Sequence, residues 1–292
     1  MSSHISKSYC AGCFSFMAVL GRLIPRFLSH PLAIVIGHLY ALTHPRKAEV
    51  IARNFQLLAS PNPPTPAQLY AEFARVLADY FYLALRPASA AIALVDERHG
   101  FPNLQPPKRG NRGALLLMPH MSFFEIGGVV MEEIGHPMAA LTNPEPSPQL
   151  TKWRADYRAR WGIETIEVGQ DHFQFLEIVK ILEAGKFVGA LFDRPHATQS
   201  YSARVPGGTL QCSSGILLLA LLSKCPVIPV VVTRKANNHY RLAALEPIFV
   251  EKKGSTAETL QYYTQKLVDV LWPTISQHPE QWFQFADLEV KR

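Results

Sequence analysis

The chain has 292 residues, of which 48% are hydrophobic and 18% are charged. This composition excludes a largely disordered chain, and the charged fraction is below the roughly 25% of typical soluble domains. A net charge of +6 suits an anionic partner such as phosphate groups, an anionic bilayer or an acidic carrier protein. Without a basic run interleaved with aromatics, and without zinc-finger spacing, the sequence gives no support for a nucleic-acid partner.

The cysteines indicate a reducing compartment. The chain has 4 of them, Cys10, Cys13, Cys212 and Cys225, which is too few for a disulfide scaffold of this length. Cys10 and Cys13 have the spacing of a redox or metal motif, but no second Cys or His pair follows at ligand spacing and no strand precedes them. We therefore expect no metal site.

The first part of the chain is apolar but interrupted. Residues 14–42 are rich in Leu, Ile, Val and Phe, yet Arg22, Pro25, Arg26 and Pro31 lie among them. Central charges disfavour a membrane-spanning helix. Arg22 and Arg26 share one helical face opposite apolar residues, which is typical of a helix lying in the bilayer interface. We predict a membrane-associated helical anchor over residues 1–45, the alternative being a pair of buried helices in a soluble protein.

The remainder, residues 46–292, is predicted to form one α/β domain of alternating strands and helices. Helices are expected on either side of a Pro-rich loop at 60–66, the second one capped by Thr65. Continuous apolar strands are expected at 114–118, 187–192, 226–233 and 240–245, and helices at 125–135, 150–161, 173–184, 214–224 and 256–272. Such alternation predicts a central, mostly parallel or mixed sheet flanked by helices.

A candidate reaction centre follows the first of these strands. His120 comes just after Met118, where α/β sheets place their ligands. If the next helix begins near Ser122, Glu125 lies in its first turn and its carboxylate can reach one imidazole nitrogen, leaving the other as a general base. The chain has no Gly-x-Ser-x-Gly elbow, so His120 would activate an acceptor directly. The alternative is a helix-capping histidine beside a solvated Glu125.

An ordered set of motifs runs along nearly the whole chain. An apolar start precedes a basic helix ending in Arg53-Asn54-Phe55, followed by the His120-x4-Glu125 pair and then by Leu191-Phe-Asp193-Arg-Pro195. The segments Gln211 to Gly215, Pro226 to Pro229 and His278 to Phe283 complete it. In this order the motifs resemble the bacterial lipid A biosynthesis (lauroyl/myristoyl) acyltransferase family, within the lysophospholipid acyltransferase superfamily.

The resemblance implies transfer of a fatty acyl chain from an acyl carrier protein or acyl-CoA thioester to a hydroxyl or amine of a glycolipid or other cell-envelope lipid. It implies no cofactor beyond that thioester, and a location on the cytoplasmic face of a bacterial inner membrane. His120 would take the acceptor proton and Glu125 would hold His120. We expect Asp193 and Arg194 to organise the cleft or bind a polar acceptor, with a salt-bridged loop pair as the alternative.

Oxyanion donors are expected either at a turn near Gly207 and Gly208 or at the helix start formed by Ser213, Ser214 and Gly215. A simple turn and a helix cap are the alternatives. We expect an apolar acyl tunnel lined by some of Phe123, Phe124, Phe192 and residues 217–222, with core packing as the alternative.

The chain departs from the family pattern at one place. Where the family usually has a Tyr-Arg pair, this sequence has Thr142-Asn143. Arg158 and its basic neighbours Lys152, Arg154 and Arg160 are therefore the candidates for an acceptor phosphate, unless they form a solvated helix face. The acceptor stays open between lipid A and another lipid, and two other activities remain: a catalytically inactive lipid-binding or assembly protein, and a thioesterase-like hydrolase.

Overall fold

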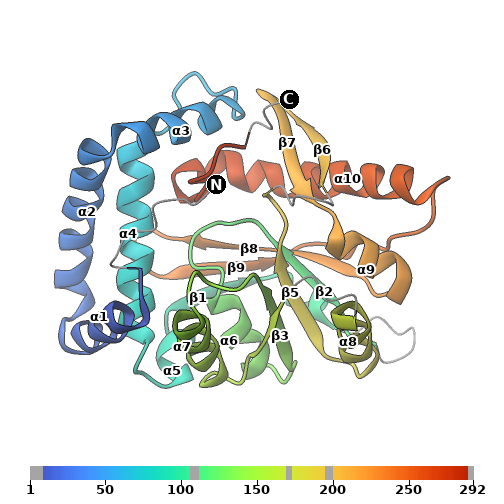
Figure 1. Ribbon diagram of the computed structural model, residues 1–292, viewed down its shortest axis with the longest axis horizontal. Helices are drawn as coiled ribbons and strands as arrows, with labels where there is room; N and C mark the ends of the chain where they lie inside the picture. Colours follow the sequence, from blue (N-terminus) through green and yellow to red (C-terminus); the bar gives the residue numbers. More distant parts are fainter. Residues whose placement is uncertain (1–8, 106–111, 169–172, 195–199, 289–292) are drawn as a thin grey trace.

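The computed structural model describes residues 9–105, 112–168, 173–194 and 200–288 (Figure 1). Within them a 7-stranded sheet has the order β1 (Val95–His99), β9 (Tyr240–Ala244), β8 (Val227–Arg234), β2 (Leu115–Met118), β5 (Phe187–Leu191), β3 (Met138–Thr142) and β4 (Glu164–Glu167). The strands from β8 to β4 are parallel, β9 is antiparallel to β8, and β1 is parallel to β9. The predicted mostly parallel, mixed sheet is confirmed.

The central strands are those with continuous apolar runs. Every residue of β2 is buried, and β8 is buried from Val227 to Thr233. Such runs are expected where helices cover both faces of a parallel sheet. The edge strands β1 and β4 instead carry charged residues, including Asp96, Glu97 and Glu164, which discourage pairing with other chains.

Helices cover the two faces of the sheet. Right-handed crossovers place α6 (Ile126–Glu133) and α7 (Pro148–Ala159) on one face, because both connections move the same way across the sheet. The reverse connections place α8 (Phe173–Glu183) and α9 (Gly215–Ser223) on the other, where α10 (Thr256–Gln277) also lies (Figure 1). Two short helices, α5 (Ala88–Ile92) and the 3-10 helix η1 (Phe101–Leu104), flank β1 in the chain.

A separate hairpin of β6 (Ser200–Val205) and β7 (Gly208–Ser213) joins β5 to α9 and lies beside α10 (Figure 1). The backbone N–H of Gly207, at the hairpin turn, donates to the carbonyl of Leu57 at 3.0 Å. A Cβ on Gly207 would lie 1.8 Å from the carbonyl oxygen of Gln56, so only glycine allows this close approach.

Four N-terminal helices form a layer at one end of the sheet (Figure 1): α1 (Ala11–Leu23), α2 (Arg26–Thr43), α3 (Pro45–Gln56) and α4 (Pro66–Leu83). Thr65 and Gln68 form a capping box at the start of α4, which confirms the predicted cap. Gly37 lets α2 pack closely on α4, since a Cβ there would lie 2.6 Å from the backbone of Ala71. No helix in the described part of the chain combines the length and apolar character needed to cross a bilayer.

A buried carboxylate ties this helical layer to the sheet. Asp79 of α4 is fully buried and accepts hydrogen bonds from Arg26 at 2.6 Å and from the Tyr240 hydroxyl of β9 at 2.6 Å. His30 of α2 also lies 2.8 Å from it through Nε2. Although burial alone would raise the pKa of Asp79, His30 and Arg26 hold that pKa below its ordinary value. The expected anchor helices are thus packed on the α/β domain through a charged contact.

Candidate active site

Two side chains meet at the carboxyl ends of neighbouring strands. His120 follows β2 and Asp193 follows β5, and the two strands are parallel partners with Met118 opposite Leu191. His120 Nδ1 lies 2.6 Å from Asp193 Oδ1, and the His120 backbone N–H donates to both carboxylate oxygens at 3.0 Å. The connection that follows β2 leads toward one edge of the sheet and the connection that follows β5 leads toward the other edge. Open α/β sheets bind ligands at such a switch point.

Asp193 is fully buried and saturated with donors. Besides His120, its carboxylate accepts from Trp282 Nε1–H at 2.7 Å and from Gln284 Nε2–H at 2.7 Å. Burial alone would raise the pKa of Asp193, but the contact with His120 and the N–H donor of Trp282 hold it below its ordinary value. Asp193 is therefore ionised at neutral pH and accepts a hydrogen bond from the Nδ1–H group of His120.

This contact fixes the state of the imidazole. With Nδ1–H donated to Asp193, Nε2 carries the free lone pair of a base. Burial lowers the pKa of His120, and although the Asp193 charge opposes that shift, the pKa stays below its ordinary value. The side chain is 17% exposed, so part of the imidazole is open to solvent. A histidine in this state, with a carboxylate on its other ring nitrogen, is able to act as a general base.

The C-terminal segment supports this pair. Phe283 N–H donates to the carbonyl of His120 at 2.7 Å, and Ser122 N–H donates to the carbonyl of Gln281 at 2.8 Å. Arg194 binds the same segment through the Phe283 carbonyl at 2.7 Å and the Gln284 side chain at 3.0 Å. Arg194 thus holds the C-terminal segment next to Asp193.

Asn54 fixes the next residues of the segment. Its amide donates to the carbonyls of Gln284 at 3.0 Å and Ala286 at 2.8 Å, and its oxygen accepts from Leu288 N–H at 3.2 Å. Asn54 and Trp282 lie in two of the sequence motifs, which assign neither a role, and Gln284 lies just beyond the last of them. An apolar, Trp-containing tail signals burial; only the fold shows that the indole N–H points at Asp193.

Glu125 is placed differently from the expectation that it holds His120. The α6 helix begins at Ile126, not near Ser122, and Ser122 has a positive φ of 50° that turns the chain first. The Glu125 Oε1 atom accepts from Arg158 at 2.6 and 3.0 Å and from Arg154 at 3.1 Å. We therefore correct the assignment of the orienting partner of His120 from Glu125 to Asp193.

The Glu125 cluster is balanced in charge. Arg154 also donates to Glu145 at 2.5 Å, so two carboxylates face two guanidinium groups. Burial alone would raise the pKa of Glu125, but Arg158 and Arg154 hold it below its ordinary value. A guanidinium fork that is bonded to a carboxylate in this way is strongly oriented.

The prediction for Arg158 is therefore corrected. Arg158 has an 8% exposed side chain that is committed to Glu125, so it is neither a free phosphate ligand nor part of a solvated face. Lys152, in contrast, is 75% exposed and pairs with Asp156 four residues away, as expected of a solvated face.

The two expected oxyanion sites have different outcomes. Gly207 and Gly208 lie against the end of α3, where the Gly207 N–H is already bonded to Leu57, so the structure does not bring them to His120. The α9 start does lie next to the pair, because Ser213 N–H donates to the carbonyl of Phe192 at 2.8 Å. Ser214 is its N-cap residue and Gly215 opens the helix, whose first N–H groups have no helical acceptor.

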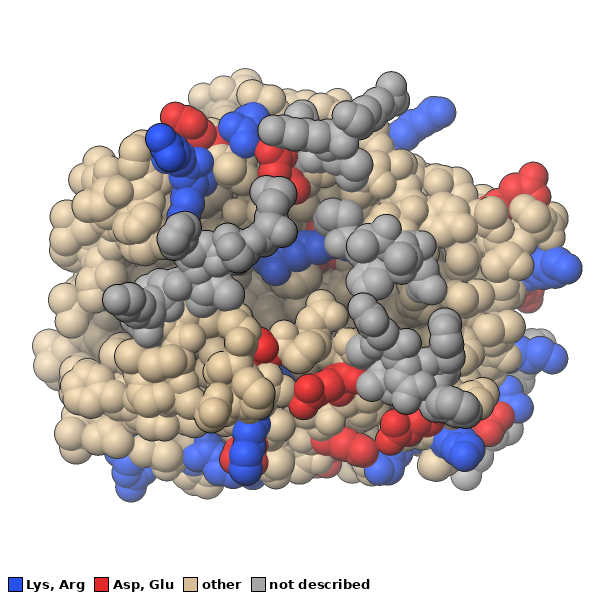
Figure 2. Space-filling model, in the orientation of Figure 1, with Lys and Arg blue, Asp and Glu red and all other residues tan. Residues whose placement is uncertain are grey.

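Of the residues expected to line an acyl tunnel, Phe123 and Phe192 are each 2% exposed and belong to the core. Leu217, Leu219 and Ala220 of α9 are also buried in the core. Phe123 packs on the Tyr80 and Tyr240 rings, with centroids 6.1 and 5.8 Å apart. In the described ranges, no three His, Cys, Asp or Glu side chains are grouped to hold a metal ion. Figure 2 shows a hollow near the centre of one face, with basic atoms inside it.

The site is thus a histidine whose Nδ1 contacts a buried carboxylate at the switch point of an α/β sheet, an arrangement that is chemically able to act as a general base. The chain belongs to the bacterial lipid A biosynthesis acyltransferase family, whose model matches residues 8–288. Membership implies an acyltransferase with an acyl donor and a lipid acceptor, and a membrane-associated enzyme. No curated protein matched the chain.

Proposed function

We propose that the protein transfers a fatty acyl chain from an acyl carrier protein or acyl-CoA thioester to a hydroxyl or amine of a glycolipid or another cell-envelope lipid. The observation that carries this proposal is the buried contact of 2.6 Å between His120 and Asp193, which leaves Nε2 of His120 as a base. The family supports acyl transfer to a lipid.

The reaction follows from the protonation states of the pair. His120 Nε2 removes the acceptor proton while the acceptor oxygen or nitrogen bonds to the thioester carbonyl carbon. Asp193 stabilises the imidazolium that forms. As the tetrahedral intermediate collapses, the C–S bond breaks and His120 returns its proton to the departing thiolate. The backbone N–H groups of the first turn of α9 are the proposed donors to the oxyanion.

We propose Glu125 as a positioning residue. Its ion pairs join the segment before α6 to α7, and that segment begins with His120. The cluster thereby holds one wall of the site in place. Glu125 thus stabilises the site, while His120 carries the proton and Asp193 orients His120.

The outer surface of the N-terminal helices is proposed to lie on the bilayer. Apolar side chains recur every three or four residues along the exposed side of α2 and are more than half exposed: Phe27, Leu28, Leu32, Val35, Ile36, Leu39 and Leu42. In Figure 2 this side has no charged atoms along most of its length, and basic atoms gather at the end toward α3. An apolar stripe with adjacent basic residues suits the cytoplasmic surface of an anionic inner membrane.

Incubation of the purified protein with a radiolabelled acyl carrier protein thioester and a bacterial lipid extract tests the function. We expect label in lipid, lost in His120→Ala and kept in His99→Ala, whose side chain is 61% exposed. Free fatty acid without labelled lipid would instead show a hydrolase. Lipid binding without turnover would show an inactive lipid-binding or assembly protein.

A further inference from the structure

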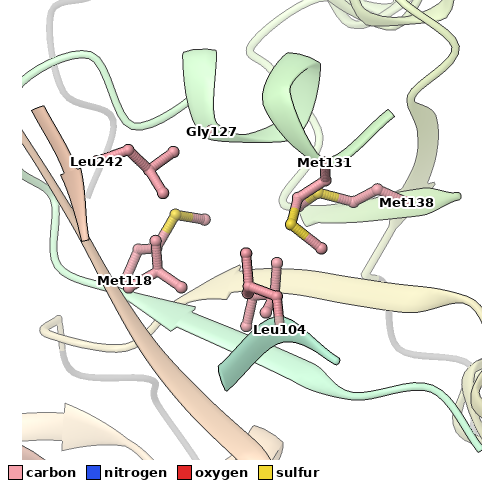
Figure 3. Close-up of a pocket in the computed structure, with 8 residues that line it drawn as sticks. Leu104, Met118, Gly127, Met131, Met138 and Leu242 are labelled. Carbon is pink, nitrogen blue, oxygen red and sulfur yellow. The ribbon is translucent and has the colours of Figure 1, made fainter. Parts of the chain in front are cut away.

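The core between the sheet and α6 is closely packed (Figure 3). The space that remains beside Met131 and Met138 is about 10 Å³, roughly the room of one water molecule. A Cβ on Gly128 of α6 would lie 2.6 Å from the side chain of Ile163. Because a close-packed interior leaves little freedom to shift, α6 is fixed on the sheet, and Glu125 depends on its own partners for its position.

The partners of Glu125 extend to the first described residue of the chain. Arg154, which donates to Glu125 at 3.1 Å, also donates to Glu145 Oε1 at 2.5 Å. The other carboxylate oxygen of Glu145 accepts from the Tyr9 hydroxyl at 2.8 Å. Burial raises the pKa of Tyr9 to about 12, so this hydroxyl keeps its proton at neutral pH. A series of charge-assisted hydrogen bonds therefore runs from Tyr9, just before α1, to Glu125.

Helix α1 also covers one side of Arg154. Phe14 of α1 packs edge-to-face on the rings of Tyr80 and Trp153, with centroids 6.5 and 5.3 Å away. The Trp153 indole N–H donates to the Ser15 hydroxyl at 3.1 Å, and α1 lies beside α7 (Figure 1). The Tyr80 ring in turn lies 6.0 Å from the Arg154 guanidinium carbon. Ion pairs strengthen where water is displaced, so α1 on α7 favours the pairs of Arg154.

The last turn of α1 is fixed on α4. A Cβ on Gly21 would lie 2.4 Å from the backbone of Phe81, so the two helices approach closely there. Arg86 donates to the carbonyl of Gly21 at 3.1 Å, and Arg22 donates to the carbonyl of Leu85 at 3.2 Å. This end of α1 can therefore serve as a hinge.

The first turn of α1 is held less firmly. Ala18 is the only buried residue of α1, all of which lies in the described part of the chain. The hydrogen bonds that Tyr9 and Ser15 make with the α7 side are exposed to solvent. Segments with few buried contacts and exposed hydrogen bonds open at a low cost in free energy. The first turn can thus leave α7 while the last turn stays on α4.

The two sides of α1 differ in polarity. Phe16, Val19 and Leu23 on the outer side are each at least half exposed, and α1 lies at the end of α2 where the apolar side of α2 begins (Figure 1). Ser15 and Arg22 on the inner side are bonded to the protein. Polar groups are costly in a bilayer, so a bilayer that receives the outer side favours α1 in its position on α7.

We propose that contact with an anionic bilayer docks the first turn of α1 on α7, and that Tyr9 then positions Glu125 through Glu145 and Arg154. The inference rests on the proposed acyl transfer and on the proposed placement of the N-terminal helices on the bilayer. Away from a bilayer the first turn of α1 opens more often, Glu145 loses its bond from Tyr9, and transfer is slower. Tyr9 acts through Glu125 and is therefore a positioning residue.

The variant Tyr9→Phe tests the positioning role, because it removes one hydroxyl from the full-length protein. The assay uses a radiolabelled acyl carrier protein thioester and a bacterial lipid extract in phosphatidylglycerol vesicles. We expect kcat to fall about tenfold, as for the loss of one hydrogen bond to a charged group, with an unchanged donor KM and melting temperature. Tyr262→Phe is the matched control and should keep wild-type kcat, since Tyr262 is a half-exposed tyrosine of α10.

Hydrogen exchange tests the effect of the bilayer without any need for turnover. Backbone exchange over α7 is measured with and without phosphatidylglycerol vesicles that contain no lipid extract. We expect the vesicles to slow this exchange in the wild-type protein and to slow it less in Tyr9→Phe.

Wild-type kcat in Tyr9→Phe would overturn the inference, as would equal exchange over α7 with and without vesicles. A lower kcat that comes with a raised donor KM and a lower melting temperature would show a merely structural role and would also overturn it. Absence of transfer by the wild-type protein would refute the proposed function itself, which is a different result.

Discussion

Replacement of Asp193 by Asn tests the orientation of His120. In the structure the carboxylate accepts from four N–H groups: the His120 backbone and Nδ1, Trp282 Nε1 and Gln284 Nε2. An asparagine has one oxygen and one NH2 group in the same space. If its oxygen faces His120, its NH2 group meets the N–H groups of Trp282 and Gln284.

Two facing donors in a fully buried position each cost about 1–3 kcal/mol, so Asp193→Asn is expected to destabilise the fold by about 2–6 kcal/mol. In the opposite orientation, the NH2 group faces His120 Nδ1 and forces the proton onto Nε2. The base is then lost, and histidine enzymes with the wrong tautomer lose roughly 10⁴-fold in rate. We expect kcat/KM for acyl transfer to fall by about 10³–10⁴-fold.

The assay is the initial rate of label transfer to lipid at fixed donor concentration, together with urea unfolding of each variant. Asp156→Asn is the control, because Asp156 is 62% exposed on α7. Wild-type kcat/KM in a folded Asp193→Asn variant would refute the orienting role of Asp193.

Three further outcomes are expected. Because burial lowers the pKa of His120, kcat/KM should fall on acidification with a midpoint below about 6.5; stability should also fall below that pH, since the unfolded chain binds this proton more readily. A midpoint above that value would contradict the buried base. Arg158→Ala leaves Glu125 with one guanidinium and should lower the free energy of unfolding in urea by about 3 kcal/mol, whereas an unchanged value would show a weak pair. Phe27→Glu and Leu42→Glu, at 75% and 76% exposed positions, should reduce sedimentation with anionic vesicles without a change in melting temperature. Wild-type sedimentation of both variants would show that the bilayer does not contact this side of α2.

Much of the fold is predictable because burial on both faces of a sheet requires continuous apolar runs. β2, β5 and β8 have such runs and their positions follow from them. β1 and β4 have no such signal, since they are short edge strands with charged residues and are defined by their pairing partners.

The candidate site is predictable only in part. His120 is found from its place after an apolar strand, but the carboxylate that reaches it depends on which strand lies next to β2. Glu125 is near in sequence, whereas Asp193 is 73 residues away and near in space. Spacing in the sequence favours Glu125 as the partner of His120, whereas the order of the strands places Asp193 there. The donors on Trp282 and Gln284 depend on the path of the C-terminal segment, which no periodicity encodes.

Mass spectrometry of lipids from a bacterial strain that lacks this protein tests most directly that it acylates an envelope lipid through His120. We expect one lipid species to lose a single acyl chain, wild-type protein to restore it, and His120→Ala at equal abundance not to restore it. An unchanged lipid profile on deletion, or full restoration by His120→Ala, would contradict the proposed reaction.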